Sequence, residues 1–327
     1  MDAAQQAGTP ARRPRIAGRI VYPVAAVLLL VAVVLAAARV GEHAGRLSDW
    51  QALVLGITQG ATELLPISSS GHLILVPWLF DWHYLEENPD FNKTFDVALH
   101  LGTLAAVVVY FWADVVRYVA AWVVSVRRRS IATADQRLAW AIFAATIPAA
   151  IAGAAGEQAI EDHLGEPWQI AILLAVFGIL LWIADRQPER RPLEGLGLGT
   201  AFWIGVSQIL ALMPGVSRSG ITITTGRFAG LERDAAARFS FLLLIPVVFG
   251  AVVYKGVKHV VLNPLPSGSS GPFVVGTLAA AGVGLIAIDL LLGYVRRHNY
   301  TPFVVYRLAV AACILLAIAT GARSATF

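Results

Sequence analysis

The sequence predicts an all-α polytopic membrane protein, an inverted-topology repeat with two re-entrant helix hairpins that meet near the bilayer midplane. The first observation is composition: of 327 residues, 57% are hydrophobic and 14% charged, whereas soluble domains are nearer to half apolar and a quarter charged. The second is a series of long apolar segments, two of them interrupted, and the third is an internal repeat. At about 20 residues per crossing, no room remains for a large water-soluble domain, so any chemistry lies among the membrane segments.

The first apolar segment, about residues 20–40, follows a polar segment that carries Arg12, Arg13 and Arg15. A signal peptide is the alternative, but the segment is longer than a usual signal-peptide core and cleavage would have to fall at its very end. We therefore expect a retained helix whose basic end lies in the cytoplasm. Residues 1–47 are predicted to be an N-terminal extension with this one extra transmembrane helix.

Six further segments are long, apolar and uninterrupted. They lie at about 95–112, 137–156, 168–185, 236–254, 273–294 and 302–320. Two others, about 49–80 and 199–230, are apolar but contain Pro, Ser and Gly in the middle. Irregular backbone is tolerated at membrane depth only around a cavity or inside protein, so we expect the functional groups in these two broken segments.

The loops predict the orientation of the chain. Arginines cluster at 127–129, 186–191 and 296–297, which places these loops in the cytoplasm, whereas the loop at 157–167 is acidic and is predicted to be external. The 49–80 segment must then enter and leave from the external face, and the 199–230 segment from the cytoplasmic face. The same clusters account for an excess of 25 basic over 21 acidic residues, so no nucleic acid partner is expected. A lone Cys313 excludes a disulfide or cysteine metal site within one chain.

The internal repeat supports two inverted halves. A shift of 149 residues superposes Gly56, Gln59, Ser68, Ser70 and Gly71 on Gly205, Gln208, Ser217, Ser219 and Gly220. A shift of 144 aligns Phe95 and Tyr110 with Phe239 and Tyr254. We predict a first repeat at 48–190 and a second at 191–327, each with one hairpin and three spans. Because three is odd, the second copy is inverted, and the two hairpin tips meet.

The first hairpin carries a polar face that leads into a serine loop. Gln59 and Glu63 are four residues apart on one face of an amphipathic half-helix that ends at Pro66. A carboxylate at membrane depth is expensive and is retained for a cation, a proton or a basic partner. The loop that follows offers hydroxyls, an imidazole and a phosphate-binding nest of backbone amides: Ser68, Ser69, Ser70, Gly71 and His72. Packing of small residues between helices is the alternative interpretation.

The second hairpin supplies a positive charge. Arg218 lies between Ser217 and Ser219 at the helix break, with Thr222 one turn further on. An arginine at this depth needs an anion, which is either Glu63 or a substrate phosphate. A purely structural pair with Glu63 is the alternative. Together the two tips contain the groups that phosphoryl transfer requires, namely a nucleophile, a proton acceptor and positive charge. Elsewhere, Asp96 and His100 face either this cavity or a neighbouring helix.

Several motifs resemble the undecaprenyl-diphosphate phosphatases of the BacA/UppP type. They are QGATE at 59–63, PISSSGH at 66–72, FDVALHLG at 95–102, PGVSRSGIT at 214–222, FSFLLLIP at 239–246 and PFVVYR at 302–307. The resemblance covers about 48–320. Gln59 takes the less acidic of the two residues that the family pattern permits, and residues 1–47 depart from the shorter family pattern.

The resemblance implies hydrolysis of undecaprenyl diphosphate to undecaprenyl phosphate and inorganic phosphate, which recycles the lipid carrier of peptidoglycan synthesis. It implies a divalent cation, Mg or Ca, held by Glu63 and Gln59. Ser69 would be the nucleophile, His72 its base or the leaving-group acid, and Arg218 the phosphate clamp. The further phosphate-binding residues would be Ser68, Ser70, Gly71, Ser217, Ser219 and Thr222. Whether Ser69 or His72 attacks phosphorus is left open.

The implied location is the bacterial cytoplasmic membrane, with the active site open to the external, periplasmic face and with the lipid bilayer and a second copy of the chain as partners. A transporter or flippase is the competing function, because inverted repeats with broken helices are the usual transporter architecture.

Overall fold

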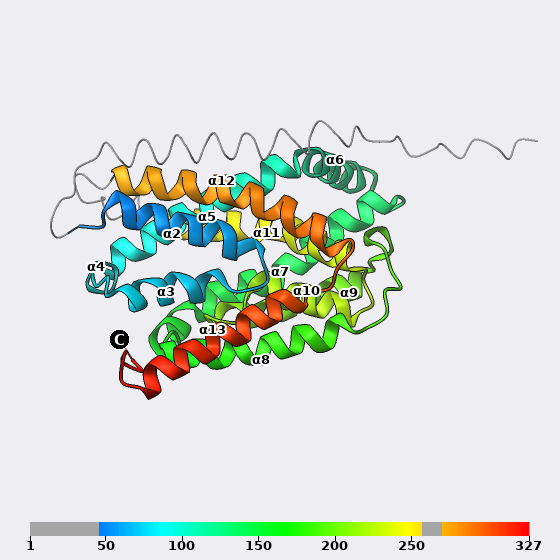
Figure 1. Ribbon diagram of the computed structural model, residues 1–327. Coiled ribbons are helices and arrows are strands. Elements are labelled where there is room, and N and C mark those ends of the chain that lie inside the picture. The colour runs from blue at the N-terminus through cyan, green and yellow to red at the C-terminus, as the bar shows by residue number, and fades with distance from the viewer. Residues whose placement is uncertain (1–45, 257–269, 327) are drawn as a thin grey trace, which may run out of the picture.

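The computed structural model describes residues 46–256 and 270–326, with the side chains of 157–163 and 255–256 excepted. The predicted N-terminal span at 20–40 lies outside these residues. The described chain is helical and contains no β-sheet (Figure 1). Its α-helices are α2 Asp49–Leu64, α3 Ser69–Phe80, α4 Tyr84–Glu87, α5 Pro89–Tyr110, α6 Trp112–Arg128, α7 Ala134–His163, α8 Pro167–Asp185, α9 Leu198–Ser207, α10 Arg218–Phe228, α11 Arg233–Gly256, α12 Ser270–Val295 and α13 Thr301–Ala319. Two short 3₁₀ helices, η1 Leu193–Gly195 and η2 Gln208–Leu212, flank α9.

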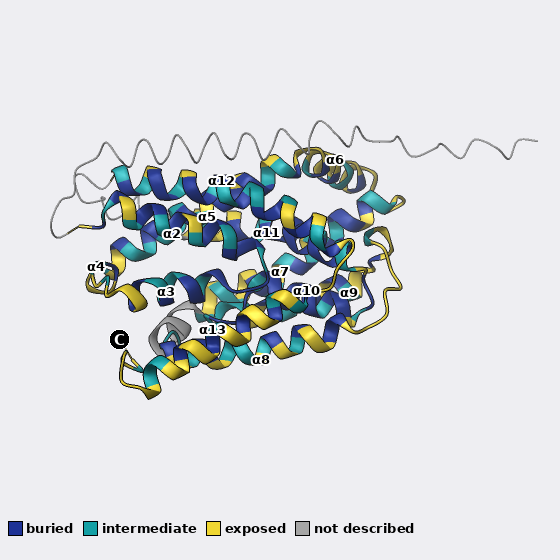
Figure 2. Cartoon of the chain, viewed as in Figure 1, coloured by how far each residue is buried: buried dark blue, intermediate teal, exposed yellow. Residues whose placement is uncertain are grey.

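Six helices in the described part of the chain are long and apolar enough to cross a membrane: α5, α7, α8, α11, α12 and α13. They correspond one for one to the six uninterrupted segments of the sequence, which confirms the all-α polytopic prediction. Large apolar side chains such as Ile172 and Leu316 remain exposed on their outer faces. Figure 2 shows this exposed surface along α8 and α13. An apolar exterior around a packed interior is the arrangement that lipid solvation favours.

The two broken segments form helical hairpins that enter the bundle from opposite ends (Figure 1). In the first, α2 and α3 are joined by a turn after Leu64, two residues before the predicted helix end at Pro66. In the second, α9 and η2 lead through residues 213–217 into α10. The turns touch inside the bundle, since the Gly215 amide donates to the Ser68 hydroxyl oxygen at 3.0 Å. The tips therefore meet as predicted, while their depth in a bilayer stays a prediction.

The helix boundaries follow the internal repeat. The helices α2 and α9 begin 149 residues apart, as do α3 and α10, and α5 and α11 begin 144 residues apart. Ser68 and Ser217 cap α3 and α10 in the same left-handed conformation, with φ of 78° and 76°. Each hydroxyl accepts a hydrogen bond from the amide of the glycine three residues later. The same local signal therefore builds both turns.

The hairpin of each half packs against the second span of the other half. Helix α2 lies along α12, and α9 lies along α7. Glycines permit both contacts: a Cβ on Gly56 would lie 2.4 Å from the Gly276 carbonyl oxygen, and a Cβ on the repeat-equivalent Gly205 would lie 2.3 Å from that of Ala145. Small residues at helix interfaces allow such close approach where lipid provides no hydrophobic driving force.

Helix α6 covers most of residues 113–129, which the sequence predicts as a loop. It is seen end-on in Figure 1, across the direction of the neighbouring helices. Trp112, Val116 and Val119 are exposed, whereas Asp114 and Tyr118 are buried. A helix with apolar and basic faces that lies across the end of a bundle is typical of a membrane interface. Its polar residues make the segment too hydrophilic to be predicted as a transmembrane helix.

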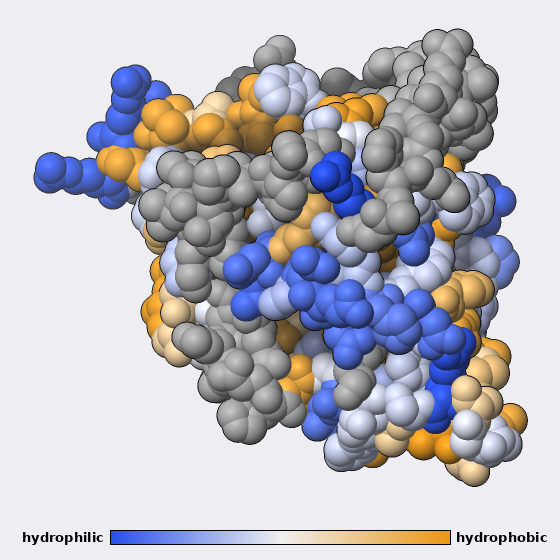
Figure 3. All heavy atoms as spheres, turned by 90° about the vertical axis from the view of Figure 1, so that its left-hand side faces the viewer, coloured by the Kyte–Doolittle hydropathy of each residue, from blue (hydrophilic) through white to orange (hydrophobic). Residues whose placement is uncertain are grey.

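The arginine clusters gather at one end of the bundle, on the right in Figure 1, where α6, α8 and α12 end. The C-terminus of α3, helix α4 and the tail after α13 gather at the other end. Figure 3 looks onto that second end and shows hydrophilic residues across its middle, with hydrophobic residues at its margins. The basic loops therefore share one end of the bundle, and the side of the membrane on which that end lies stays a prediction.

Because the Gly56 contact leaves no room for a methyl group, Gly56→Ala should lower the apparent melting temperature in detergent, by the equivalent of about 1–3 kcal/mol. Gly250→Ala is the matched control, since a Cβ on Gly250 meets nothing within 4 Å. Equal melting temperatures for the two variants would contradict the close packing of α2 on α12.

Candidate active site

The carboxylate of Glu63, near the end of α2, is where the two hairpins converge. It is 6% exposed. Its Oε1 lies 3.0 Å from Arg218 Nη2, and its Oε2 accepts a hydrogen bond from the Ser69 hydroxyl. Gln59 Nε2 lies 3.4 Å and His100 Nε2 3.8 Å from the same Oε2. The predicted Glu63–Arg218 pair is therefore present, and a hydroxyl and an imidazole share the same carboxylate.

Arg218 is the first residue of α10, and only the two terminal nitrogens of its guanidinium have recorded partners. Besides Glu63, its Nη1 donates to the Ser240 carbonyl oxygen at 2.9 Å. Its Nε is buried and has no hydrogen-bond partner among the described residues. Because guanidinium binds phosphate through a fork of donors, this arginine retains capacity for a second anion.

Four of the predicted phosphate-binding residues instead use their hydroxyls to fix the turns. Ser68 Oγ accepts from the amides of Gly71 and Gly215, and Ser217 Oγ accepts from that of Gly220. Ser219 Oγ donates across the hairpins to the Leu65 carbonyl oxygen at 2.9 Å, and Thr222 Oγ1 makes contacts with α10 and Ser240. Ser70 is half-buried. Ser69 differs from all four because its hydroxyl faces the carboxylate.

His72 is held at both ring nitrogens. Nδ1 lies 2.6 Å from the Ser68 carbonyl oxygen, which can only accept, so Nδ1 carries the hydrogen. Nε2 is then an acceptor and lies 2.9 Å from the hydroxyl of Tyr306 on α13, whose ring stacks on the imidazole at an interplanar angle of 15°. Tyr306 belongs to the PFVVYR motif, to which the sequence interpretation gave no role. His72 is near the site, but its protein partners are Ser68 and Tyr306 rather than Ser69.

Arg307, next to Tyr306, joins the two turns from behind. It is fully buried, and its guanidinium donates to backbone carbonyl oxygens of both hairpins and of α8: Pro66, Gly215, Val216, Leu173 and Leu174. No carboxylate among the described residues pairs with it. The sequence offered only the motif as a signal, because the contacted carbonyls lie up to 241 positions away.

The divalent cation that the resemblance implies can be tested against these donors. Among the described residues, no three His, Cys, Asp or Glu side chains gather as a metal cluster. Gln59 Oε1, however, is buried without a hydrogen-bond partner there, beside the carboxylate of Glu63. Mg²⁺ is commonly bound by one or two carboxylates together with substrate phosphates. The residues therefore fit a cation that a phosphate ligand completes, not a cage made by the protein alone.

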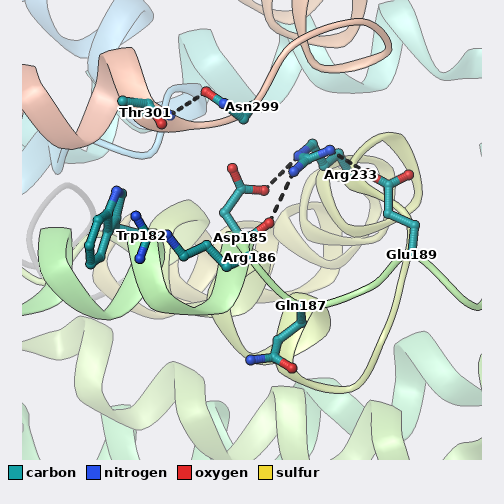
Figure 4. A pocket seen from close by; sticks show the side chains of 8 residues that line it. All are labelled: Trp182, Asp185, Arg186, Gln187, Glu189, Arg233, Asn299 and Thr301. Carbon is teal, nitrogen blue, oxygen red and sulfur yellow. Dashed lines mark hydrogen bonds and ion pairs between the residues drawn. The ribbon is translucent and has the colours of Figure 1, made fainter.

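Two surface pockets lie at the two ends of the bundle, and none of the predicted site residues lines either of them. The larger, about 620 Å³, is bordered by α3 and by the C-terminal tail, where Arg323 hydrogen-bonds Asp81 and lowers the pKa of that carboxyl. The smaller, about 340 Å³, lies at the opposite end (Figure 4). There Arg233 binds both Asp185 and Glu189 at 2.6 Å. The two carboxylates of this smaller pocket are thus paired with Arg233, whereas Arg186 lies over the ring of Trp182.

Comparison with known proteins identifies relatives over most of the chain. The model of the family described as bacitracin resistance protein BacA matches residues 52–313. The undecaprenyl-diphosphatase of Moorella thermoacetica is 46% identical over 266 residues, which are 81% of this chain and 96% of that protein. That of Thermomicrobium roseum is 45% identical over 278 residues, 82% and 98% of the two chains. That of Geobacter sulfurreducens is 46% identical over 266 residues, 81% and 96% of the two.

Arg307→Lys should destabilise the protein strongly, because an ammonium group cannot serve carbonyls on three segments at once. Each buried carbonyl left without a donor costs about 1–3 kcal/mol. The readout is the apparent melting temperature in detergent, compared with that of Arg297→Lys at an exposed position between α12 and α13. If Arg307→Lys melts at the wild-type temperature, Arg307 does not stabilise the fold by joining the two turns.

Proposed function

The chain belongs to the bacitracin resistance protein BacA family, and we propose that it hydrolyses undecaprenyl diphosphate to undecaprenyl phosphate and inorganic phosphate where its two hairpin turns meet. The observation that carries this assignment is the convergence of a hydroxyl, a carboxylate and a guanidinium from three helices on one buried point. The reaction regenerates the lipid carrier of peptidoglycan synthesis.

Arg218 binds the terminal phosphate. Phosphoryl transfer depends mainly on positioning and on positive charge around the equatorial oxygens. The unpartnered Nε of Arg218 supplies a donor for one of these oxygens, and the backbone amide of Ser70, in the first turn of α3, supplies another. The hydroxyls of Ser217, Ser219 and Thr222 hold Arg218 and its turn in place, which is a positioning role.

Ser69 is the nucleophile and Glu63 its base. The Ser69 hydroxyl donates to Glu63, so the carboxylate takes the proton as the Ser69 oxygen forms a bond to the terminal phosphorus. The bond from that phosphorus to the bridging oxygen breaks, and undecaprenyl phosphate leaves with the electron pair. Water then attacks the phosphoserine, and the returning proton restores the Ser69 hydroxyl. His72 is less suited to attack phosphorus, since both of its nitrogens already have partners in the protein.

A divalent cation, Mg or Ca, would be held by Glu63 and by the unpartnered oxygen of Gln59 together with the diphosphate. When bound, it supplies positive charge that stabilises the transferring phosphate.

The protein is a multi-pass membrane protein, and its location is the bacterial cytoplasmic membrane. The site opens to the periplasmic face, because the hairpin that carries Glu63 and Ser69 enters from the end opposite to the arginine clusters. A homodimer is a separate expectation, which the mass of the purified particle in detergent tests.

Phosphate release from undecaprenyl diphosphate by the purified protein tests the assignment. We expect release that a chelator suppresses, and a loss of at least about a hundredfold in kcat for both Glu63→Gln and Arg218→Lys, which remove the base or the guanidinium fork with little change of volume. Arg128→Lys, exposed at the end of α6, is the matched control. If the folded wild type releases no phosphate but moves lipid across vesicle membranes, the protein is a transporter and the phosphatase assignment is wrong.

Trapping distinguishes the two candidate nucleophiles. After rapid acid quench of the enzyme with substrate labelled in the terminal phosphate, we expect an acid-stable phosphoserine that Ser69→Ala abolishes. His72→Gln should slow turnover while the label stays on Ser69. An acid-labile, base-stable adduct that survives in Ser69→Ala would assign the attack to His72 instead.

A further inference from the structure

We propose that Tyr306 on α13 is a positioning residue for the nucleophile, because it fixes the tautomer of His72 and through it the carbonyl group of Ser68. The inference rests on the proposed function and adds to it a role for two residues that take no part in the phosphoryl transfer. It starts from a chain of two hydrogen bonds that ends on the peptide group directly before Ser69.

The chain runs from the hydroxyl of Tyr306 through the imidazole to the backbone. The hydroxyl oxygen lies 2.9 Å from Nε2 of His72, and Nδ1 of the same ring lies 2.6 Å from the Ser68 carbonyl oxygen. A neutral imidazole carries its hydrogen on one nitrogen only, and the hydrogen bond at the other nitrogen decides which. Because the Tyr306 hydroxyl donates to Nε2, the hydrogen stays on Nδ1 and is donated to the carbonyl oxygen.

The carbonyl group at the end of this chain belongs to a backbone conformation that needs support. Ser68 has a φ of 78°, which residues other than glycine rarely adopt and which persists only where the surrounding structure holds it. The next residue is Ser69, whose hydroxyl donates to Glu63. A displacement of a reacting group by about 1 Å can cost roughly a hundredfold in rate, so a hydrogen bond that fixes this peptide group contributes to catalysis.

The neighbouring residue on α13 fixes the position of Tyr306 relative to the same turn. Arg307 is fully buried, and its Nη1 donates to the Pro66 carbonyl oxygen at 3.2 Å. The ring of Tyr306 stacks on the imidazole of His72 at an interplanar angle of 15°, yet the residue is 41% exposed. As far as packing is concerned, phenylalanine would serve such a stacked and exposed position equally well. The hydroxyl that binds His72 is therefore the feature that requires tyrosine.

The second hairpin shows that such a chain is not needed to form the turn itself. Ser217 adopts the same backbone conformation, with a φ of 76°. Ile221 takes the place of His72 there, and among the described residues the Ser217 carbonyl oxygen has only the Ile221 amide as a recorded partner. The turn that carries the nucleophile therefore has one more hydrogen-bond chain than the turn that carries Arg218. This difference links the chain to the chemistry of the first turn.

The first test removes the hydroxyl and keeps the ring. We expect Tyr306→Phe to retain the wild-type melting temperature in detergent and the wild-type KM for undecaprenyl diphosphate, while kcat falls roughly tenfold, as the loss of one hydrogen bond allows. Tyr294→Phe is the matched control with wild-type kcat, since Tyr294 also stacks on a histidine, His298. The ¹⁵N spectrum of the histidine rings reports the tautomer, and the His72 signals are those that His72→Asn lacks. The wild type should carry hydrogen on Nδ1 alone, and Tyr306→Phe should show a mixture of both tautomers.

Replacement of His72 tests whether Tyr306 acts through it. Asparagine places an amide donor near the position of Nδ1, whereas glutamine places it near that of Nε2. We therefore expect His72→Asn, which can still donate to the Ser68 carbonyl oxygen, to have a higher kcat than His72→Gln. Addition of Tyr306→Phe to His72→Asn should cause no further loss, because the two changes interrupt the same chain.

The outcomes separate the positioning role from the proposed function. A wild type that releases no phosphate would overturn the proposed function, and the positioning role with it. If the wild type is active, full kcat in Tyr306→Phe or an unchanged His72 tautomer in that variant would overturn the positioning role alone. An equal loss when Tyr306→Phe is added to His72→Asn would show that the hydroxyl acts without His72, and a raised KM with unchanged kcat would assign it to substrate binding instead.

Discussion

The guanidinium of Arg307 is the constraint on which the two-hairpin arrangement depends. Breaking a helix inside a membrane protein exposes backbone carbonyls where water cannot solvate them, and each needs a donor from the protein. Arg307 provides donors to both turns and to α8 from one side chain. Carbonyl dipoles stabilise its charge, and no carboxylate among the described residues neutralises it. The positive potential of Arg307 therefore remains next to the two hairpin turns, where the diphosphate is proposed to bind.

The repeat provides symmetric scaffolding and asymmetric chemistry. Ser68 and Ser217 cap their helices alike, and Gly71 and Gly220 donate to them alike. At other equivalent positions the halves differ. Arg218 corresponds to Ser69, Ile221 to His72 and Leu212 to Glu63. The nucleophile and its base therefore come from one hairpin and the arginine from the other, so that a pair of similar turns produces a single site that neither half contains by itself.

The predictable part of the structure is the part encoded locally. The lengths of the apolar segments predict the six spans, and prolines and glycines predict where the two other segments break. The free-energy cost of a charge at membrane depth predicts that Glu63 and Arg218 form a pair. Helix α6 is not predicted because charged residues interrupt its apolar residues, so the segment does not have the uninterrupted apolar length of a transmembrane helix. The partners of Tyr306 and Arg307 are distant in sequence, so the motif that contains these two residues does not indicate their roles. The capping role of Ser68 and Ser217 depends on a left-handed backbone that no spacing reveals.

The exchange of packing partners between the halves bears on how the protein is made. Helix α2, with Gly56 and Gly60, is among the first segments described, whereas its partner α12, with Gly276 and Ala280, is among the last to be synthesised. During translation the first hairpin therefore waits, with its glycine face uncovered, until nearly the whole chain has entered the membrane. Biogenesis must shelter this segment in the insertion machinery or at the aqueous interface, because a nascent chain arrested before α12 lacks both the packing partner of α2 and the arginine that joins the two turns.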